Sequence, residues 1–583
     1  MSTSASTQIC FTNRDNYFIP REVFAQVMTY QRVLDLVFVL KCFGDLEDIS
    51  KRQWADRICF GDSASGPSLK IFAALIGVGH ANEIRQQVED KLNDDCLPLQ
   101  YNFSGANNPN RLIHCQKHAD EQHPCQHKVN EWEDKDDRVR FMDWTRQLTA
   151  LYITSQDGTH LHYEMMQGDR LPINRCKEIP SESIQVPPQY RPLGYGGYSD
   201  VFQVKIHDTH SGLPKERPHI LNRDGTYALK RLTSHKTEDF ELELSSLLFA
   251  AHQQGKKKHV IQLLVTFEVK QPGSEEATFY LLFDWAKGNL RDFWKQNPDL
   301  VGDPKHGLWM ATQFHGLAEA LELVHNDRMR TLHRLPPDIS TNLNLYGRHG
   351  DITPKNLLVF ESKKDELVLV LADFGLGKLH TQYSRSQQDP KQLARTETYR
   401  PPEFDFEGGK ISPASDIFSL GCVFLEHISF HLKGPDALDQ FSKERVERDI
   451  YRFEADTFFR IEMRNGEEVP VLKPKVREWI QSLKDDARCT KYIFQMLEVI
   501  ESDMLDPNPT TRLRADRIVK ILKALLQSCK VSETFYLMPM SEDNRREEAH
   551  EGWAGRAKNK MERVTALVFC THCWNTWSRI EED

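Results

Sequence analysis

The stretch from His349 to Phe360, HGDITPKNLLVF, is the most informative part of this 583-residue chain. It places a carboxylate (Asp351), an ammonium group (Lys355) and an amide (Asn356) within six residues, directly before an apolar run. On its own, an aspartate such as Asp351 is usually a turn residue or a helix cap. A functional interpretation of this stretch is favoured because other charged and glycine-rich segments lie on both sides of it in the sequence.

Four segments follow this stretch along the chain. LADFGLGK contains Asp373, TETYRPPEF contains Glu403, SDIFSLGC contains Asp416 and DPNPTTR contains Arg512. Each joins a charged side chain to turn residues or apolar neighbours, and one such pattern alone would carry little weight. Their order along the chain is the informative property.

A glycine-rich run, GYGGYSDV, begins at Gly194 with strand-like residues on both sides. Gly194, Gly196 and Gly197 would let backbone amides approach phosphate oxygens with no Cβ in the way. A plain glycine-rich hairpin is the alternative. The strand-like YALKRL that follows favours the phosphate interpretation, because it carries Lys230, whose ammonium group could reach phosphates under such a loop.

Taken in order, these segments resemble the signature set of the eukaryotic protein kinases: glycine loop, strand lysine, catalytic loop, DFG and the segment ending in PPE. The resemblance covers residues 188–530 and implies an α+β, bilobal protein-kinase-like fold. The chain also resembles fungal kinase-domain proteins in which HGD replaces HRD, a long insert precedes the catalytic loop and an α-helical region precedes the kinase domain. KIFAALIGVG and YGRHGD carry this second resemblance.

The resemblance implies ATP and Mg²⁺ as cofactors and gives each motif residue a role in phosphoryl transfer. Asp351 is expected to accept the hydroxyl proton, and Lys355 to neutralise the transferring phosphate. Lys230 is expected to bind the α- and β-phosphates. Asn356 and Asp373 are expected to hold Mg²⁺.

Glu243 is expected to pair with Lys230 and orient it. Phe240, Glu243 and Leu247 follow the F-x-x-E-x-x-x-L spacing of the corresponding kinase helix. Glu241 is the alternative partner for the lysine.

The resemblance also implies two contacts that serve structure rather than chemistry. Asp416 is expected to brace the catalytic loop. Glu403 and Arg512 are expected to form a buried ion pair that pins the activation segment to the large lobe.

The adenine ring is expected beside the strand-like YLLFDWAKGNL. Phe283 would stand at the back of the pocket, and the backbone from Asp284 to Ala286 would offer hydrogen bonds. The full nucleotide-binding set that the resemblance implies is Gly194, Gly196, Gly197, Ser199, Val201, Ala228, Lys230, Phe283, Asp284 and Ala286.

Three positions depart from the usual kinase pattern. Ser199 stands at the third glycine of the loop, and the other glycines are expected to supply enough flexibility. Thr353 occupies the position where Ser/Thr kinases carry a lysine, and Lys355 is expected to take its place. Gly350 replaces the arginine beside the catalytic aspartate, so a phosphate on the activation segment would lack its usual partner.

Two functions of different classes are consistent with these motifs. The favoured one is an ATP-dependent protein kinase that phosphorylates Ser and Thr hydroxyls of protein substrates, since every residue expected to serve ATP, Mg²⁺ and proton acceptance is present. Thr396 agrees with Ser/Thr specificity, because it lies where such kinases keep a threonine. The alternative is a pseudokinase or scaffold that binds nucleotide or partners without efficient phosphotransfer.

Composition limits the partners of the chain. The chain has 85 acidic against 75 basic residues, and its net charge of -10 has the wrong sign for general polyanion binding, so nucleic acid is disfavoured. Twelve cysteines are too few for a disulfide scaffold, which favours a cytoplasmic or nuclear protein. The most apolar stretch near the N-terminus, residues 33–43, is well short of the ~20 residues of a membrane span. We therefore expect no membrane partner.

Pattern shifts predict four parts. Residues 1–100 show helical periodicity and form a small, mainly α-helical module, which is a candidate for binding a protein partner. Residues 101–187 are predicted to be a loop-rich connector. The kinase domain is predicted at 188–530, with a small lobe at 188–284 and a large lobe at 285–530. Residues 531–583 are predicted to be a linker and tail.

A cysteine- and histidine-rich segment, HCQKHADEQHPCQHK, begins at His114. Its residue types suit Zn²⁺, but their order is not a familiar structural-zinc spacing. A polar surface loop is the favoured interpretation. The CTHC sequence at residues 570–573 leaves the same two interpretations open, a group of zinc ligands or a polar surface segment.

Overall fold

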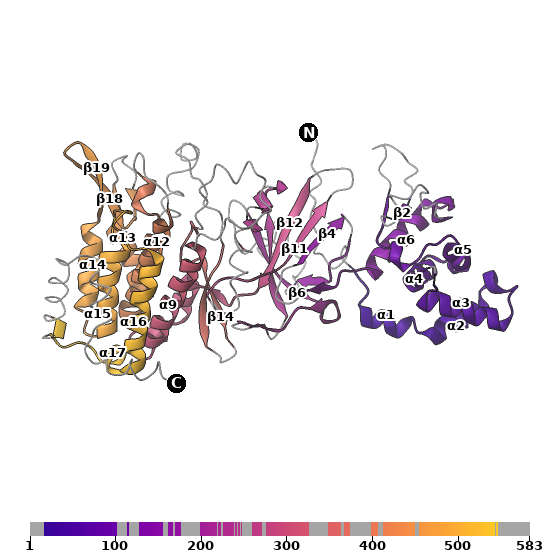
Figure 1. Cartoon of the computed structure of the whole chain (residues 1–583), viewed down its shortest axis with the longest axis horizontal. Coiled ribbons are helices and arrows are strands. Elements are labelled where there is room, and N and C mark those ends of the chain that lie inside the picture. The colour runs from indigo at the N-terminus through magenta and orange to yellow at the C-terminus, as the bar shows by residue number, and fades with distance from the viewer. Residues whose placement is uncertain are drawn as a thin grey trace, which may run out of the picture. The chain divides into compact units, whose positions relative to one another are not determined.

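The structure is a computed structural model of the chain (Figure 1). The residues that it describes are 17–63, 65–101, 113–115, 128–155, 161–166, 169–175, 199–217, 220–222, 225–237, 239–241, 243–244, 247, 259–270, 276–325, 348–362, 366–373, 398–405, 412–448, 454–542 and 544–545. They divide into two compact units. The first contains the N-terminal helices and the six-stranded sheet of the small lobe, and the second contains the large lobe.

The N-terminal region is helical, as the sequence predicts. Its helices are α1 (Arg21–Val27), α2 (Tyr30–Val39), α3 (Asp48–Phe60), α4 (Leu69–Val78), α5 (Ile84–Glu89) and α6 (Lys135–Leu148). The apolar positions of these helices meet in one core, which also includes residues beyond 100 such as Phe141 and Met142 of α6. Two short strands, β1 (Leu99–Tyr101) and β2 (Ile113–Cys115), form an antiparallel pair in this region.

The small-lobe sheet has six strands in the order β4-β11-β12-β10-β6-β5. Four of them follow the alternating or buried apolar patterns of the kinase segment: β6 (Ser199–Ile206), β10 (Thr226–Leu232), β11 (Leu263–Lys270) and β12 (Ala277–Asp284). The two edge strands come from the segment that precedes it. β4 (Leu161–Met166) pairs parallel to β11, and β5 (Ile173–Arg175) pairs antiparallel to β6.

The edge strands lie in the part of the sequence that we expect to be rich in loops. They are short, and a three-residue strand such as β5 carries too few residues for a periodic pattern to be recognised. Their apolar side chains are nevertheless buried in the core of the sheet, which contains Met165, Leu171 and Ile173 beside Val204 and Val265.

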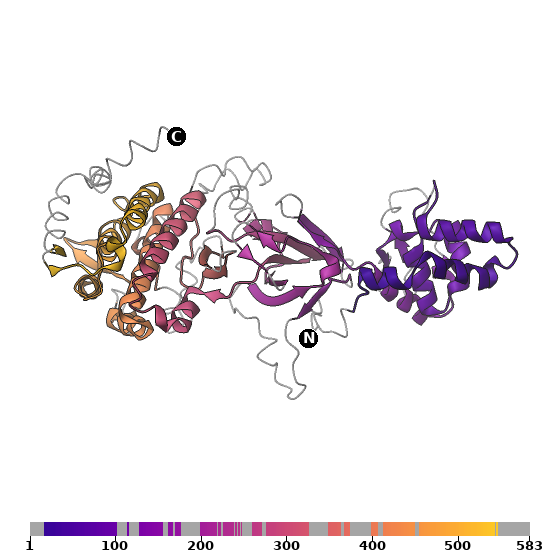
Figure 2. The ribbon, with the colours of Figure 1, turned by 90° about the horizontal axis from the view of Figure 1, so that it is seen from below.

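The large lobe is mainly helical (Figure 2). Its helices are α8 (Leu290–Gln296), α9 (His306–His325), α12 (Pro413–Lys433), α13 (Pro435–Arg445), α14 (Pro474–Lys484), α15 (Lys491–Val499), α16 (Ala515–Val531) and α17 (Thr534–Leu537). α12 is the central helix, since every residue from Ser415 to Leu432 is buried. α12 is therefore buried on all sides, and its polar side chains, such as Asp416 and Glu426, make hydrogen bonds inside the lobe.

Short strands complete the architecture. The large lobe contains the sheet β13 (Gly288–Asn289), β14 (Leu357–Glu361) and β15 (Leu367–Leu371), the pair β16 (Glu447–Arg448) and β17 (Glu454–Ala455), and the hairpin of β18 (Phe459–Arg464) and β19 (Glu467–Leu472). The remaining strands are β3 (Ile153–Thr154), β7 (Ser211–Gly212), β8 (Glu216–Arg217) and β9 (Ile220–Leu221). Asn465 and Gly466, at φ 56° and 84°, form the turn of the β18–β19 hairpin, where an Asn-Gly pair suits two left-handed residues.

One close approach joins α9 to the segment before β11. A Cβ at Gly316 would lie 2.0 Å from Nε2 of His259, so only glycine leaves room for this ring. His259 in turn places its Nδ1 2.7 Å from the carbonyl oxygen of Leu369 in β15. The helix, the buried histidine and the strand before Asp373 therefore form one packed layer.

Among the described residues, we find no helix with the length and apolar character needed to cross a membrane.

Candidate active site

The catalytic loop is held by Asp416 of α12. The backbone N–H of His349 donates to Asp416 Oδ2 at 2.8 Å, and the N–H of Gly350 donates to Oδ1 at 2.8 Å. His325, at the C-terminal end of α9, lies 2.8 Å from Asp416 Oδ2 through its Nε2. The predicted brace between Asp416 and the loop is confirmed.

Asp416 remains ionised in this buried position. Burial by itself raises the pKa of the carboxyl group, but the hydrogen bond and the charge of His325, with further hydrogen bonding from the loop, lower the pKa below its ordinary value. A charged carboxylate accepts stronger hydrogen bonds than a neutral one, so the brace is strongest in this form.

His349 connects the catalytic loop to the strand that precedes Asp373. Its Nε2 lies 3.0 Å from the carbonyl oxygen of Ala372, and its Nδ1 accepts a hydrogen bond from the N–H of Asp351 at 3.3 Å. This pattern requires a neutral ring with the proton on Nε2. Complete burial lowers the pKa of His349 and favours that neutral form.

Asn356 joins Asp351 of the catalytic loop to the backbone just before Asp373. Its amide nitrogen Nδ2 donates to the Asp351 carbonyl at 2.8 Å and to Asp351 Oδ2 at 2.9 Å. Its backbone carbonyl oxygen accepts from the N–H of Ala372 at 2.9 Å. Because the amide nitrogen faces Asp351, the amide oxygen is the atom that Asn356 can offer to a cation.

The β14–β15 pairing explains why Asn356 and Asp373 lie near each other. Leu357 pairs with Leu371, so Asn356 just precedes one strand where Asp373 just follows the other. Asp373 is exposed and has a left-handed φ of 59°, which aspartate tolerates better than most residues. Oxygen donors of this kind suit Mg²⁺.

Gly350 has a structural role that its sequence position does not reveal. Its φ is 81°, in the left-handed region that favours glycine.

The other two residues of interest in the loop are Lys355 and Thr353. Lys355 is exposed, and the backbone carbonyl of Thr353 accepts a hydrogen bond from the N–H of Asn356 at 3.0 Å. Thr353 therefore closes the turn through its backbone, which leaves its side-chain position open to another residue type.

Four of the predicted nucleotide residues, Val201, Ala228, Lys230 and Phe283, share one face of the sheet. Lys230 in β10 pairs with Val201 of β6, and Ala228 pairs with Phe283 of β12. Directly paired residues point to the same side of a sheet, and so do residues two apart on one strand. This face places Lys230 beside the apolar side chains of Val201, Ala228 and Phe283, an arrangement that suits a purine and its phosphates.

The hinge side of this sheet has a partner that sequence reasoning missed. Asp284 is buried, and its Oδ1 accepts a hydrogen bond from Asn222 Nδ2 at 3.2 Å. Asn222 lies in a short loop before β10, and no sequence pattern identifies it as a partner of Asp284.

The other predicted nucleotide residues are placed as follows. Gly194, Gly196 and Gly197 lie outside the described residues.

Ser199 begins β6, and Ala286 is half-buried just after β12. Lys230 belongs to the first unit and Glu243 to the second, so their pairing stays a prediction.

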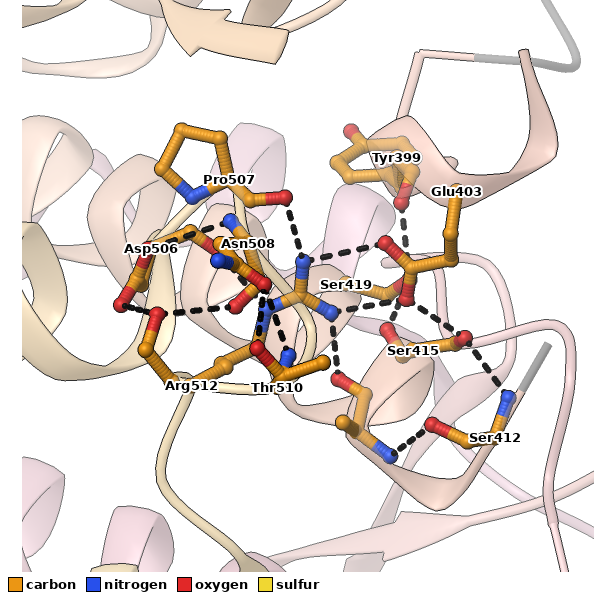
Figure 3. A network of polar contacts seen from close by, with 12 residues as sticks. Tyr399, Glu403, Ser412, Ser415, Ser419, Asp506, Pro507, Asn508, Thr510 and Arg512 are labelled. Atoms are coloured by element: carbon orange, nitrogen blue, oxygen red, sulfur yellow. Dashed lines mark hydrogen bonds and ion pairs between the residues drawn. The ribbon is translucent and has the colours of Figure 1, made fainter. Parts of the chain in front are cut away.

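Glu403 and Arg512 form the predicted buried ion pair (Figure 3). Arg512 donates from Nη1 to Oε1 at 2.8 Å and from Nη2 to Oε2 at 3.0 Å, which is the bidentate geometry of a strong pair. Ser415 Oγ adds a third hydrogen bond to Glu403 at 2.7 Å. The remaining donors of Arg512 reach the carbonyl oxygens of Asp506 and Ala414, both at 2.8 Å.

A second buried network holds the residues that precede Glu403. The Tyr399 hydroxyl donates to Glu426 Oε2 at 2.6 Å, and the Thr398 hydroxyl donates to Asp456 Oδ1 at 2.6 Å. Arg445 is fully buried between them and lies 3.3 Å from Glu426 Oε1. Sequence reasoning missed this network, because Arg445 stands in an ordinary run of charged residues.

The cysteine- and histidine-rich segment falls largely outside the described residues. Cys115 is described and is buried in β2, where it contributes to the helical core. Within the described ranges, one group has ligand atoms close enough for a metal: His162, Glu164 and Glu268, on β4 and β11. Lys270 lies 3.1 Å from Glu268 and 3.6 Å from Glu164, so this lysine already balances the two carboxylates.

A sheet with a lysine strand, together with a helical lobe that braces an Asp-Asn catalytic loop, defines a protein of the kinase class. Residues 189–521 match the protein kinase domain, which is more than half of the chain, and the chain belongs to this family. The α+β kinase-like fold with a preceding helical region is thereby confirmed.

Curated relatives are similar at low identity. Cyclin-dependent kinase 8 of Drosophila melanogaster is 24% identical over 253 residues, which cover 42% of this chain and 47% of the relative. Serine/threonine-protein kinase SSN3 of Pyricularia oryzae is 25% identical over 149 residues, covering 23% and 28%. Cell division control protein 2 homolog 2 of Trypanosoma brucei brucei is 40% identical over 82 residues, covering 13% and 21%.

The matches therefore span about half or less of these relatives. The likeness to fungal proteins with an HGD loop stays a prediction.

Proposed function

We propose that this chain is an active protein kinase that transfers the γ-phosphate of ATP to Ser and Thr hydroxyls of protein substrates. The observation that carries the proposal is the hydrogen bond from Asn356 to Asp351 in a loop fixed by Asp416. It holds the carboxylate that would accept a proton beside an amide that would hold a metal. Such preorganisation is the main contribution of a protein to phosphoryl transfer.

In this proposal each residue acts through charge or position. Asp351 accepts the proton of the substrate hydroxyl, and Lys355 offers a positive charge to the phosphoryl group. Asn356 and Asp373 would hold Mg²⁺, which when bound neutralises phosphate oxygens. Lys230 would bind the α- and β-phosphates.

The proposed serine/threonine specificity rests on a relative and on one residue position. The relative from Pyricularia oryzae is a serine/threonine-protein kinase by name, and Thr396 stands at a position typical of such enzymes. We propose an intracellular protein substrate, because twelve cysteines are too few for a disulfide scaffold.

A pseudokinase or scaffold is the second candidate. Gly350 and Thr353 favour it, because two charges common in active kinases are absent from these positions.

One experiment separates the two functions. Purified full-length protein is incubated with Mg²⁺, radiolabelled ATP and generic protein substrates, and the products are analysed for phosphoserine, phosphothreonine and phosphotyrosine. We expect transfer to Ser and Thr that is lost in Asp351→Asn. A Mg²⁺-dependent thermal shift with ATP but no transfer would support the pseudokinase instead, and label on tyrosine would overturn the specificity.

A further inference from the structure

The edge strand β4 lies before the kinase match yet belongs to the kinase sheet. The match begins at residue 189, whereas β4 spans Leu161–Met166 and runs parallel to β11 over its whole length. In this register His162 stands opposite Thr266, and Glu164 stands opposite Glu268. A segment outside the kinase motifs thus contributes side chains to the surface beside β11.

The ring of His162 is held in place by both of its nitrogens. Nδ1 lies 2.9 Å from the Thr266 hydroxyl, and Nε2 lies 3.3 Å from Glu268 Oε2. Lys270 fixes Glu268 further through a 3.1 Å ion pair. The imidazole therefore has one preferred orientation on the edge of the sheet.

This ring packs against Phe240, at the beginning of the helix that carries Glu243. The centroids of the His162 and Phe240 rings are 5.7 Å apart, at an interplanar angle of 37°. Phe240 also stacks on Phe279 of β12, at 4.4 Å and 8°. Phe240 is buried, so the histidine closes one side of an aromatic stack.

Other contacts fix the backbone that leads into this helix. His235 Nδ1 lies 3.0 Å from the Ala277 carbonyl, and the Ser234 hydroxyl donates to Asp239 Oδ2 at 2.5 Å. The described residues between 237 and 247 are helical. Glu243 follows Phe240 by three positions, which places the two side chains on neighbouring parts of the same helical face.

We infer that His162 is a positioning residue for Glu243, through its contact with Phe240. The aromatic stack sets where the helix begins, and one turn later the same helix presents the glutamate that is expected to orient Lys230. This role rests on the proposed kinase function. It also gives the segment before the kinase domain a structural role, because β4 carries the histidine that packs against this helix.

The test uses full-length protein with three variants. His162→Ala removes the ring, and His162→Phe keeps a ring without its hydrogen bonds. Glu164→Gln is the matched control on the same strand, because its side chain is largely exposed and lies 3.6 Å from the Lys270 ammonium group. For each variant we measure kcat, KM for ATP, and hydrogen exchange of the peptide that covers residues 239–247.

We expect His162→Ala to lower kcat about 10-fold, since a small misplacement of a positioning group can cost up to ~100-fold. His162→Phe should recover most of the loss, and Glu164→Gln should behave like the wild type. Exchange in 239–247 should increase in His162→Ala alone. Unchanged exchange in His162→Ala would overturn the inference, and so would an equal effect of Glu164→Gln.

The two proposals fail separately in this design. If the wild type transfers no phosphate, the proposed function is wrong, and hydrogen exchange alone then decides whether His162 supports the helix. If the wild type is active and His162→Ala keeps its kcat, the kinase function stands and the positioning role is wrong.

Discussion

Arg512 and Glu403 lie 109 residues apart in the sequence and face each other through two hydrogen bonds of 2.8 and 3.0 Å, with both side chains fully buried. The pair joins the segment that ends in PPE to the loop before α16. Because neither group reaches water, each is stable in this position only while the other is present. Figure 3 shows how Ser415 and the backbone around Asp506 complete the network.

Removing one member of this pair should therefore destabilise the large lobe strongly. We expect Arg512→Met to cost about 3–5 kcal/mol, because it leaves the Glu403 carboxylate buried without a counter-charge. The double variant Arg512→Met with Glu403→Leu should cost clearly less than the sum of the two single changes. Urea unfolding followed by tryptophan fluorescence measures both. A single-variant cost below about 1 kcal/mol would contradict the argument.

Two charges of the nucleotide site should be essential for transfer but not for folding. Lys230→Met and Asp373→Asn each remove one charge with little change in volume, and Lys230 is half-buried while Asp373 is exposed. We expect each variant to lose ~100-fold or more in turnover at saturating ATP, with an unchanged melting temperature. Lys520→Met, on an exposed position of α16, is the control. Wild-type turnover in either site variant would show that the assigned role is wrong.

Lys355 should supply the positive charge that Thr353 does not. The lysine is exposed on the catalytic loop, and the contact of Thr353 in that loop is made by its backbone carbonyl. We expect Lys355→Ala to lower kcat by ~100-fold. Adding Thr353→Lys should then restore part of the activity without disturbing the turn. Little loss in the first variant, followed by no gain in the second, would mean that another group neutralises the phosphate.

A buried cluster of histidines in the large lobe predicts a pH dependence of stability. Trp294 Nε1 donates to His427 Nδ1 at 2.9 Å, and His427 Nε2 lies 3.0 Å from His306 Nε2. Since Nδ1 of His427 accepts a hydrogen bond, the ring proton of His427 is on Nε2. This N–H points to Nε2 of His306, which must therefore act as the acceptor. Both rings are therefore neutral. Burial lowers the pKa of His306 to about 3, and it also lowers the pKa of His427.

In the unfolded chain these histidines titrate near pH 6.5, so the unfolded state binds more protons than the folded state below that pH. The stability is complete above about pH 6.5 and falls as the pH decreases towards 3. For His306 alone the slope should be about 1.4 kcal/mol per pH unit, or about 2 kcal/mol between pH 6.5 and 5. Urea unfolding at several pH values measures this slope.

His306→Phe should reduce that slope, whereas Lys520→Met, a change at an exposed position of α16, should leave it unchanged. An identical slope in His306→Phe and the wild type would show that the cluster does not control acid stability.

The edge strands predict different outcomes for two truncations. Deleting residues 1–149 leaves β4 and β5 in place, whereas deleting 1–187 removes both and uncovers the edges formed by β11 and β6. Exposed sheet edges pair with other chains, and the core also loses Met165 and Ile173. We expect the longer deletion to aggregate and the shorter one to remain monodisperse, as measured by light scattering. Equal solubility of the two proteins would contradict a structural role for the edge strands.

The kinase motifs could be located from the sequence because they are local. Asp351, Asn356 and Asp373 stand beside turn residues and short apolar strands, and their spacing matches a pattern that the β14–β15 pairing then explains. The Glu403–Arg512 pair and the Asp416 brace could be predicted only through the resemblance, since their partners are far apart in the chain. The structure contains both contacts.

Other features depend on long-range packing and leave no local signal. His325 ends the largely buried helix α9, and only the packing of α9 near α12 brings it to Asp416. β4 and β5 are too short for a clear periodic pattern, and they become strands because β11 and β6 offer unpaired backbone edges. The sequence alone determines the chemistry of each side chain. Burial and backbone pairing depend on segments that meet only after the chain has folded. Burial and pairing therefore determine which residues support the site.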